Sequence, residues 1–219
     1  NFEILENIDE ILELREKIDI AKIILGSKSK SLTNLRDIKL AKIPEFITIK
    51  KSEIGSIDKA IRKLDDELII RSDSESEDSF TESNAGKFIS IGPVHKKNKK
   101  ELNFAIRKVL NSYLKSQGTD KVIVQNFVKN IISSGVITTR LLGNSSPYYC
   151  LSISESSNSD EVTSGNTNKI KNIYIHKNIE KLEGKLKKYQ YLLDFVNELI
   201  KVINYELLDI EFAVDKNKN

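Results

Sequence analysis

The chain has 219 residues, of which 39% are hydrophobic and 31% charged, a balance typical of a globular protein with a sizeable core. Its 35 basic and 32 acidic residues nearly cancel, and the formal charge of +3 argues against a nucleic-acid partner. The single cysteine excludes an internal disulfide and favours a cytoplasmic location. No apolar run approaches the 18 residues of a membrane helix, so no membrane contact is expected.

The spacing of apolar residues predicts alternating helices and strands in the first half of the chain. In chain order the expected elements are a helix (6–24), a small-residue turn with two lysines (26–32), a strand (46–49), a short helix (56–64), a strand (68–70), a polar loop (72–84), a strand (87–91) and a helix (102–113).

The second half is richer in strands, which are expected at 122–128, 135–140, 148–153, 170–175 and 207–214, with one long amphipathic helix at 179–204. Strands mixed with helices in both halves predict an α/β (α+β mixed) fold. We expect two lobes, residues 1–117 and 118–219, divided near Gly118.

Two acids stand close together in the last predicted strand, at Asp209 and Glu211. Residues i and i+2 of a strand point to the same side, so both carboxylates are expected on one face. Carboxylate oxygens suit Mg²⁺, which usually takes one or two of them together with substrate phosphates. The alternative from spacing alone is a half-exposed edge strand with solvated acids.

Two cationic positions in the first half could hold phosphate. Arg71 follows a short apolar strand and enters a Ser-rich loop, where a guanidinium can grip phosphate through two hydrogen bonds. Lys28 or Lys30 could supply a second positive charge, since both lie among small residues that allow close backbone approach to a ligand. The alternatives after Arg71 are a disordered surface loop or a phosphorylation target. At Lys28, where no Walker motif is present, the alternative is a solvated turn.

Read in order, several short motifs resemble the ATP-binding domain of the pyruvate phosphate dikinase and phosphoenolpyruvate synthase family. They are Gly26-Ser27-Lys28, Arg71-Ser72 with Glu77-Asp78, Ala85-Gly86, Val124-Gln125-Asn126-Phe127-Val128, Gly135-Val136-Ile137-Thr138-Thr139-Arg140, Val162 with Gly165, and Asp209-Ile210-Glu211-Phe212-Ala213. The resemblance implies an ATP-grasp fold with two lobes. It also implies transfer of the β-phosphoryl group of ATP to a histidine on another domain of the full-length protein, leaving AMP and phosphate.

The same resemblance implies roles for particular residues. Lys28 and Arg71 would be catalytic and, with Arg140, would hold the phosphates; Gln125, Asn126, Phe127 and Val128 would border the adenine; Asp209 and Glu211 would bind Mg²⁺. The phosphoryl acceptor would sit on a further domain, and the amide of L-glutamine in capsule biosynthesis is one candidate.

The chain also departs from that family. The glycines expected in the loop at 158–161 are missing, and the sequence stops at Asn219, before a strand that would complete the site. A degenerate, non-catalytic nucleotide-binding or sensor module is therefore the alternative function, and a structural domain without a ligand is a third.

Overall fold

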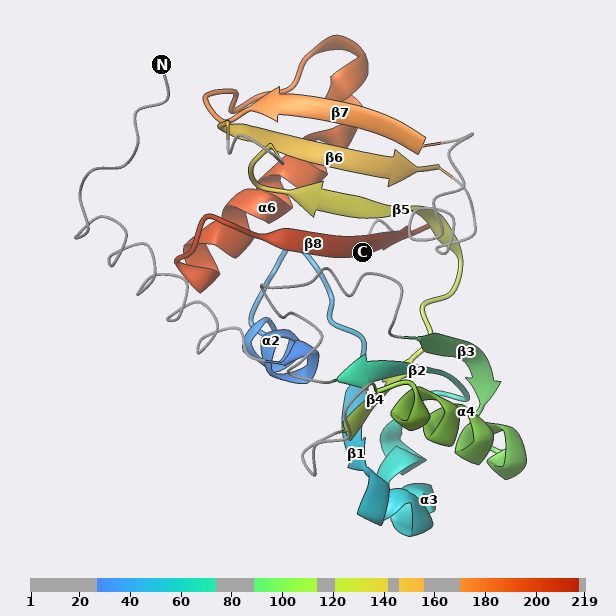
Figure 1. Ribbon diagram of the computed structural model, residues 1–219. Coiled ribbons are helices and arrows are strands. Elements are labelled where there is room, and N and C mark those ends of the chain that lie inside the picture. The colour runs from blue at the N-terminus through green and yellow to red at the C-terminus, as the bar shows by residue number, and fades with distance from the viewer. Residues whose placement is uncertain (1–26, 74–88, 114–120, 142–145, 156–169, 217–219) are drawn as a thin grey trace, which may run out of the picture. The chain divides into compact units, whose positions relative to one another are not determined.

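The computed structural model describes residues 27–73, 89–113, 121–141, 146–155 and 170–216 (Figure 1). The chain divides into two compact units. Unit 1 comprises residues 1–36 and 43–127, and unit 2 comprises residues 37–42 and 128–219. Each unit contains one four-stranded antiparallel sheet.

The sheet of unit 1 has the strand order β1-β4-β2-β3, and all its neighbouring strands are antiparallel. Its strands are β1 (Phe46–Lys50), β2 (Glu67–Asp73), β3 (Ser90–His95) and β4 (Lys121–Asn126). The helical segments that the structure describes in this unit are α2 (Lys28–Asn34), η1 (Lys51–Ser56), α3 (Ile57–Ala60), η2 (Ile61–Lys63) and α4 (Lys99–Asn111).

Helix α4 covers one face of this sheet. The Asn98 side chain caps the helix by accepting a hydrogen bond from the backbone N–H of Glu101, one of the donors that a helix start leaves unpaired. The buried stripe of α4 packs into one core with α3, η2 and the sheet. The sheet contributes Leu68, Ile70, Val94, Val122 and Val124, and α4 contributes Leu102, Ala105, Ile106, Val109 and Leu110.

The sheet of unit 2 has the order β7-β6-β5-β8, again antiparallel throughout. Its strands are β5 (Ile131–Thr138), β6 (Tyr148–Ser154), β7 (Ile170–His176) and β8 (Asp209–Asp215). The segments η4 (Gly184–Tyr189) and α6 (Gln190–Ile203), which lie between β7 and β8 in the chain, pack on one face of the sheet. Helix α6 ends where Asn204 adopts the left-handed conformation, with φ of 53°. Residues 37–42 also belong to this unit: the N–H groups of Lys39 and Leu40 each donate to the Glu198 carboxylate at 2.9 Å.

Several predicted elements differ from the structure. The strands expected at 87–91 and 135–140 are β3 (Ser90–His95) and β5 (Ile131–Thr138). The helix expected at 179–204 begins only at Gln190, after the 3-10 turn η4, because Gly184 has a φ of +55° and the Leu182 N–H donates to the Gln190 side chain. The expected turn around Lys28 is the helix α2, and β2 runs on to Asp73 instead of ending at Ile70.

Other expectations lie outside the described residues: the helix at 6–24, Gly26, most of the loop at 72–84 with Glu77-Asp78, Ala85-Gly86, Gly118 and the segment 158–165. None of the described helices combines the length and the apolar character that crossing a membrane requires.

Gly135 in β5 sits where the chain has no room for a side chain. A Cβ atom added there would lie 2.2 Å from the Ser152 carbonyl oxygen and 3.0 Å from the ring of Phe212. Phe212 is the cross-strand partner of Gly135, so its ring fills the space that the missing side chain leaves. This contact favours the observed register of β8 against β5.

We therefore expect Gly135→Ala to lower the free energy of unfolding by about 1–3 kcal/mol, the range for overpacking a well-filled site. Chemical denaturation measures the change. Gly55→Ala is the matched control, because nothing lies within 4 Å of a Cβ at that position. Equal losses in the two variants would contradict the role given to the Gly135 contact.

Glu155, directly after β6, ties together three parts of unit 2. Its carboxylate accepts hydrogen bonds from the ammonium groups of Lys171 and Lys188, both at 2.5 Å, and from the Tyr189 hydroxyl at 2.9 Å. These hydrogen bonds, that of Lys171 first, lower the pKa of Glu155 to about 2. All three charged side chains are more than a third exposed, so solvent screens their interaction.

A carboxylate with a lowered pKa stabilises the folded state above its ordinary pKa and loses that contribution as the pH falls through the folded-state value. We expect Glu155→Gln to reduce the free energy of unfolding at pH 6, and the difference from the wild type to shrink as the pH falls from 4.5 towards about 2. Urea titrations at pH 6 and pH 3 measure this, with the exposed Glu180→Gln as the control. A difference that stays constant with pH would count against it.

Candidate functional site

The two acids predicted to bind Mg²⁺ lie on the same face of the unit 2 sheet. Ile210, which lies between the two acids, and Phe212, which follows Glu211, point to the opposite face and pack on the core that contains α6. Asp209 and Glu211 are both exposed, opposite Thr138 and Val136 of β5. We call this side of the sheet, opposite α6, the carboxylate face.

The carboxylate face carries both apolar and polar side chains around these acids. Ser152 of β6, the cross-strand partner of Val136, donates a hydrogen bond of 2.9 Å to the Asn172 side chain on β7. Among the described residues no group of three or more His, Cys, Asp or Glu side chains could hold a metal alone. Two exposed carboxylates nevertheless fit Mg²⁺, which commonly completes its octahedral shell with water and substrate phosphates.

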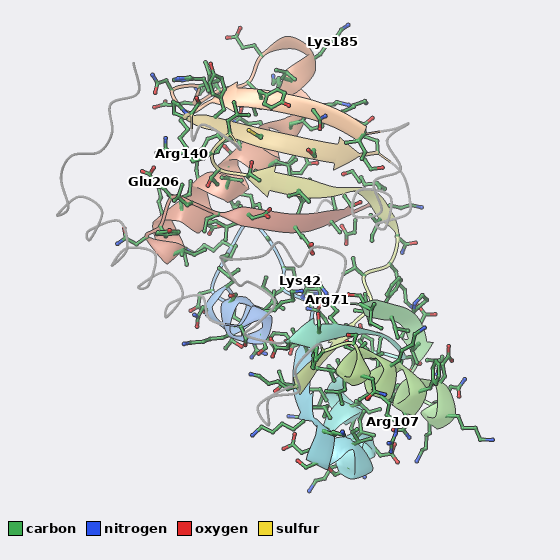
Figure 2. The ribbon with its side chains drawn as sticks, viewed as in Figure 1. Lys42, Arg71, Arg107, Arg140, Lys185 and Glu206 are labelled. Atoms are coloured by element: carbon green, nitrogen blue, oxygen red, sulfur yellow. The ribbon has the colours of Figure 1, made fainter. Side chains whose placement is uncertain are left out.

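Arg140, the predicted phosphate ligand of unit 2, is engaged in an ion pair. Its guanidinium donates to Glu206 Oε2 at 2.9 Å (Figure 2). The Lys177 ammonium donates to the same oxygen at 3.3 Å. Lys177, and to a smaller extent Arg140, lower the pKa of Glu206. A phosphate bound by Arg140 would therefore have to compete with a carboxylate already in place.

In unit 1 the predicted residues Arg71 and Gln125 share the sheet face opposite α4. Ile69 pairs with Gln125, and Arg71 pairs with Ile123, so these residues alternate with the buried Leu68, Ile70, Val122 and Val124. Gln125 is 5% exposed and donates from Nε2 to the Pro44 carbonyl at 3.2 Å. We call this side of the sheet the Arg71 face.

The segment predicted to border adenine begins in β4 and ends where unit 1 gives way to unit 2, between Phe127 and Val128. The N–H groups of Asn126 and Phe127 donate to the carbonyls of Glu45 and Glu67, both at 2.9 Å. The Asn126 side chain accepts a hydrogen bond from the Asp65 N–H. These amides are thus committed within unit 1, which limits what the segment offers to a ligand.

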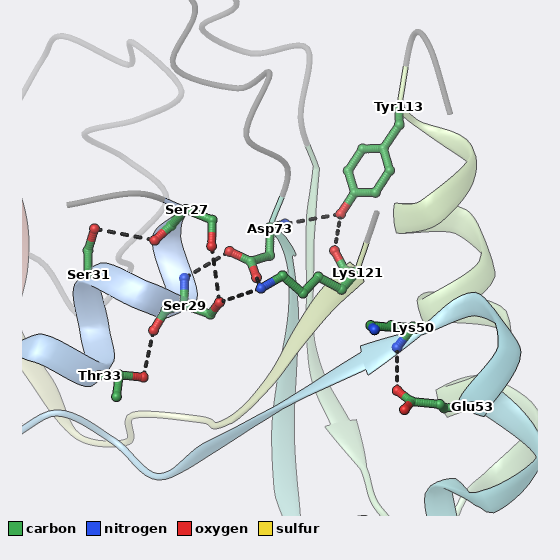
Figure 3. Close-up of polar contacts among 9 residues, drawn as sticks. All are labelled: Ser27, Ser29, Ser31, Thr33, Lys50, Glu53, Asp73, Tyr113 and Lys121. Carbon is green, nitrogen blue, oxygen red and sulfur yellow. Dashed lines mark hydrogen bonds and ion pairs between the residues drawn. The ribbon is translucent and has the colours of Figure 1, made fainter. Parts of the chain in front are cut away.

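Lys28 is the first residue of α2, and the residue after it is bonded to the Arg71 face. The Ser29 N–H donates to the Asp73 carboxylate at 2.8 Å, and Asp73 lies beside Lys121 in the sheet register (Figure 3). Neither Asp73 nor Lys121 is among the predicted site residues, because Asp73 was expected in an acidic loop. The spacing of Arg71 and Asp73, two residues apart as on one face of a strand, was the sequence signal that the strand continues to Asp73.

A cavity of about 440 Å³ lies elsewhere in unit 1, between η1, α3 and α4. Its lining includes Lys51, Asn103 and Arg107 but none of the predicted site residues. This cavity is therefore separate from the residues that the sequence predicted for the site.

No family model matches the sequence, and no curated protein matches it either. Solved structures do match. N5-carboxyaminoimidazole synthetase from Staphylococcus aureus is 18% identical, with 90% of this chain covering 42% of the enzyme at a TM-score of 0.50. A second structure of that enzyme, complexed with ADP, has the same identity and coverage and a TM-score of 0.48.

D-alanine-D-alanine ligase from Helicobacter pylori is 12% identical, with 89% of this chain covering 52% of the ligase at a TM-score of 0.52. The chain spans about half the length of these proteins. At such low identity the likeness shows the fold alone.

The comparisons correct one expectation and confirm another. The resemblance to the pyruvate phosphate dikinase and phosphoenolpyruvate synthase family, including its L-glutamine kinase branch, is wrong, because the structural neighbours are ATP-grasp ligases and none points to that family. The mixed α/β fold with two antiparallel sheets matches the ATP-grasp fold of these neighbours.

Proposed function

We propose that this chain binds ATP with Mg²⁺ and is the nucleotide-binding part of an ATP-dependent enzyme of the ligase type. The observation that supports the proposal most is the difference in the residues found on the two faces of each sheet. Helices and apolar side chains occupy one face. Four of the residues predicted to bind ATP and Mg²⁺ lie on the other, Arg71 and Gln125 in unit 1 and Asp209 and Glu211 in unit 2.

In this proposal Asp209 and Glu211 would hold Mg²⁺, and Lys28 and Arg71 would bind phosphate oxygens, with Arg140 exchanging its Glu206 partner for phosphate. The backbone of residues 125–128 would border the adenine through groups other than the committed amides of Asn126 and Phe127. When bound, Mg²⁺ would neutralise the negative charge that builds up as a phosphoryl group is transferred.

The ligase type rests on the fold neighbours, which are named a synthetase and a ligase. Their fold supports an ATP-binding domain and gives no support to phosphohistidine transfer. A non-catalytic nucleotide-binding module is the second candidate, and the Arg140–Glu206 ion pair favours it, because this contact occupies a cation that a catalytic site would direct at phosphate.

The carboxylate assignment predicts a loss of ATP affinity in Glu211→Gln. We expect the dissociation constant of ATP measured with Mg²⁺ to rise about 10- to 100-fold, the equivalent of losing about 1.5–3 kcal/mol from a charged contact. Isothermal titration calorimetry on this chain measures it. Asp194→Asn is the matched control, because Asp194 is an exposed acid on α6, away from the carboxylate face.

Equal affinity in Glu211→Gln and the wild type would remove the carboxylate assignment, and absence of ATP binding by the wild type would remove the whole proposal. Arg71→Ala tests the phosphate assignment of unit 1 in the same assay. If the wild type binds ATP but the whole protein never converts it to ADP, the second candidate is favoured over the enzyme.

A further inference from the structure

A buried polar cluster joins the start of α2 to the Arg71 face of unit 1 (Figure 3). At its centre is Asp73, whose side chain is fully buried. Its Oδ1 accepts the Ser29 N–H at 2.8 Å, and its Oδ2 faces the Lys121 ammonium at 3.4 Å as an ion pair without hydrogen-bond geometry. Lys121 also donates to the Ser29 hydroxyl at 3.3 Å, so α2 is held by both charges of the pair.

Tyr113 supports the cluster from its other side. The tyrosine hydroxyl accepts the Asp73 N–H at 3.0 Å and donates to the Lys121 carbonyl at 2.5 Å. These contacts fix the ends of β2 and β4 and involve no residue of α2. Two kinds of bond therefore meet at Asp73, one to the helix and one within the sheet.

The bond to Ser29 does for α2 what a capping residue normally does. Ser27 stands at the N-cap position, yet its side chain makes no capping hydrogen bond. The N–H of the second helical residue, which a cap would satisfy, is instead satisfied by Asp73, from a strand 44 residues further along the chain. Because α2 is only seven residues long, this one contact has a large share in setting where the helix starts.

A buried ion pair seldom stabilises a protein more than well-packed apolar side chains would, so stability alone is a weak reason for placing a carboxylate here. What the carboxylate does supply is a fixed geometry, because it accepts the Ser29 N–H through one oxygen while the other faces the Lys121 ammonium. The residue whose place is fixed is Lys28, immediately before Ser29 and the first residue of the helix.

We propose that Asp73 is a positioning residue for Lys28. By accepting the Ser29 N–H, and with Lys121 as its counter-charge, Asp73 holds the start of α2 on the Arg71 face and so fixes the point from which Lys28 reaches phosphate. This inference rests on the proposed function, in which Lys28 binds the phosphates of ATP.

The test is a double-mutant cycle on ATP affinity, measured by calorimetry with Mg²⁺ present. We expect Asp73→Ala to raise the dissociation constant roughly 5- to 10-fold, about 1–1.4 kcal/mol. The same substitution in a Lys28→Ala background should have no further effect, since a residue that acts only through Lys28 loses its influence when Lys28 is gone. Additive losses in the double variant would overturn the inference.

Two more variants separate positioning from general loss of stability. In Asp73→Asn the side-chain oxygen can still accept the Ser29 N–H, so affinity should stay within about twofold of the wild type. Tyr113→Phe breaks contacts of the same cluster that do not reach α2, so it should lower stability without lowering affinity. Weak binding in Tyr113→Phe equal to that in Asp73→Ala would make the role merely structural and would overturn the proposal.

A readout without nucleotide keeps this inference distinct from the proposed function. Amide hydrogen exchange should become faster in Lys28–Asn34 of Asp73→Ala, while α4 keeps its protection. Unchanged exchange in α2 would overturn the positioning role even if ATP binds. Faster exchange in a protein that binds no ATP would instead leave α2 anchored by Asp73 but remove its function.

Discussion

Side chains alternate between the two faces of every strand, and in both units one face is already committed to helices. Leu68, Ile70 and Val124 must meet α4, so Arg71, Asp73 and Gln125 fall on the other side. In β8, Ile210 and Phe212 pack on the core with α6, and Asp209 and Glu211 are thereby turned away from it. A slip of one residue would bury two carboxylates, so the register of β8 is under strong constraint.

The charged groups of this protein serve different purposes depending on their surroundings. Glu155 holds exposed lysines, and its contribution depends on pH and salt. Asp73 is buried and keeps one partner on each side, a helix amide and the Lys121 ammonium. Arg140 and Glu206 form another exposed pair, so a ligand with a higher negative charge can compete for the guanidinium.

The sequence predicted best what depends on short-range periodicity. The strands β1, β6 and β7 fall within a residue of their expected ends, and the common face of Asp209 and Glu211 follows from their spacing alone. The expected helix at 179–204 was too long, because its periodicity continues past Gly184, where the backbone turns left-handed.

Contacts between distant segments could not be predicted in this way. Asp73 and Lys121 become neighbours only through the pairing of β2 with β4, and Ser29 joins them only when α2 docks. The mistaken family resemblance has a related cause. Motifs such as Asp209-Ile210-Glu211 and Gly135-Val136 lie in the strands β8 and β5, and a strand of a fold does not by itself identify the chemistry carried out on that fold.

Residues 37–42 belong to unit 2 although the chain on either side of them belongs to unit 1. The chain consequently passes from one unit to the other three times, and neither unit is one uninterrupted stretch of sequence. A fragment that begins at Val128 would lack Lys39 and Leu40, and its Glu198 would therefore lose the two N–H donors that these residues supply. To express unit 2 as a separate domain, residues 37–42 therefore have to be kept with it, either fused to the fragment beside α6 or added as a separate peptide.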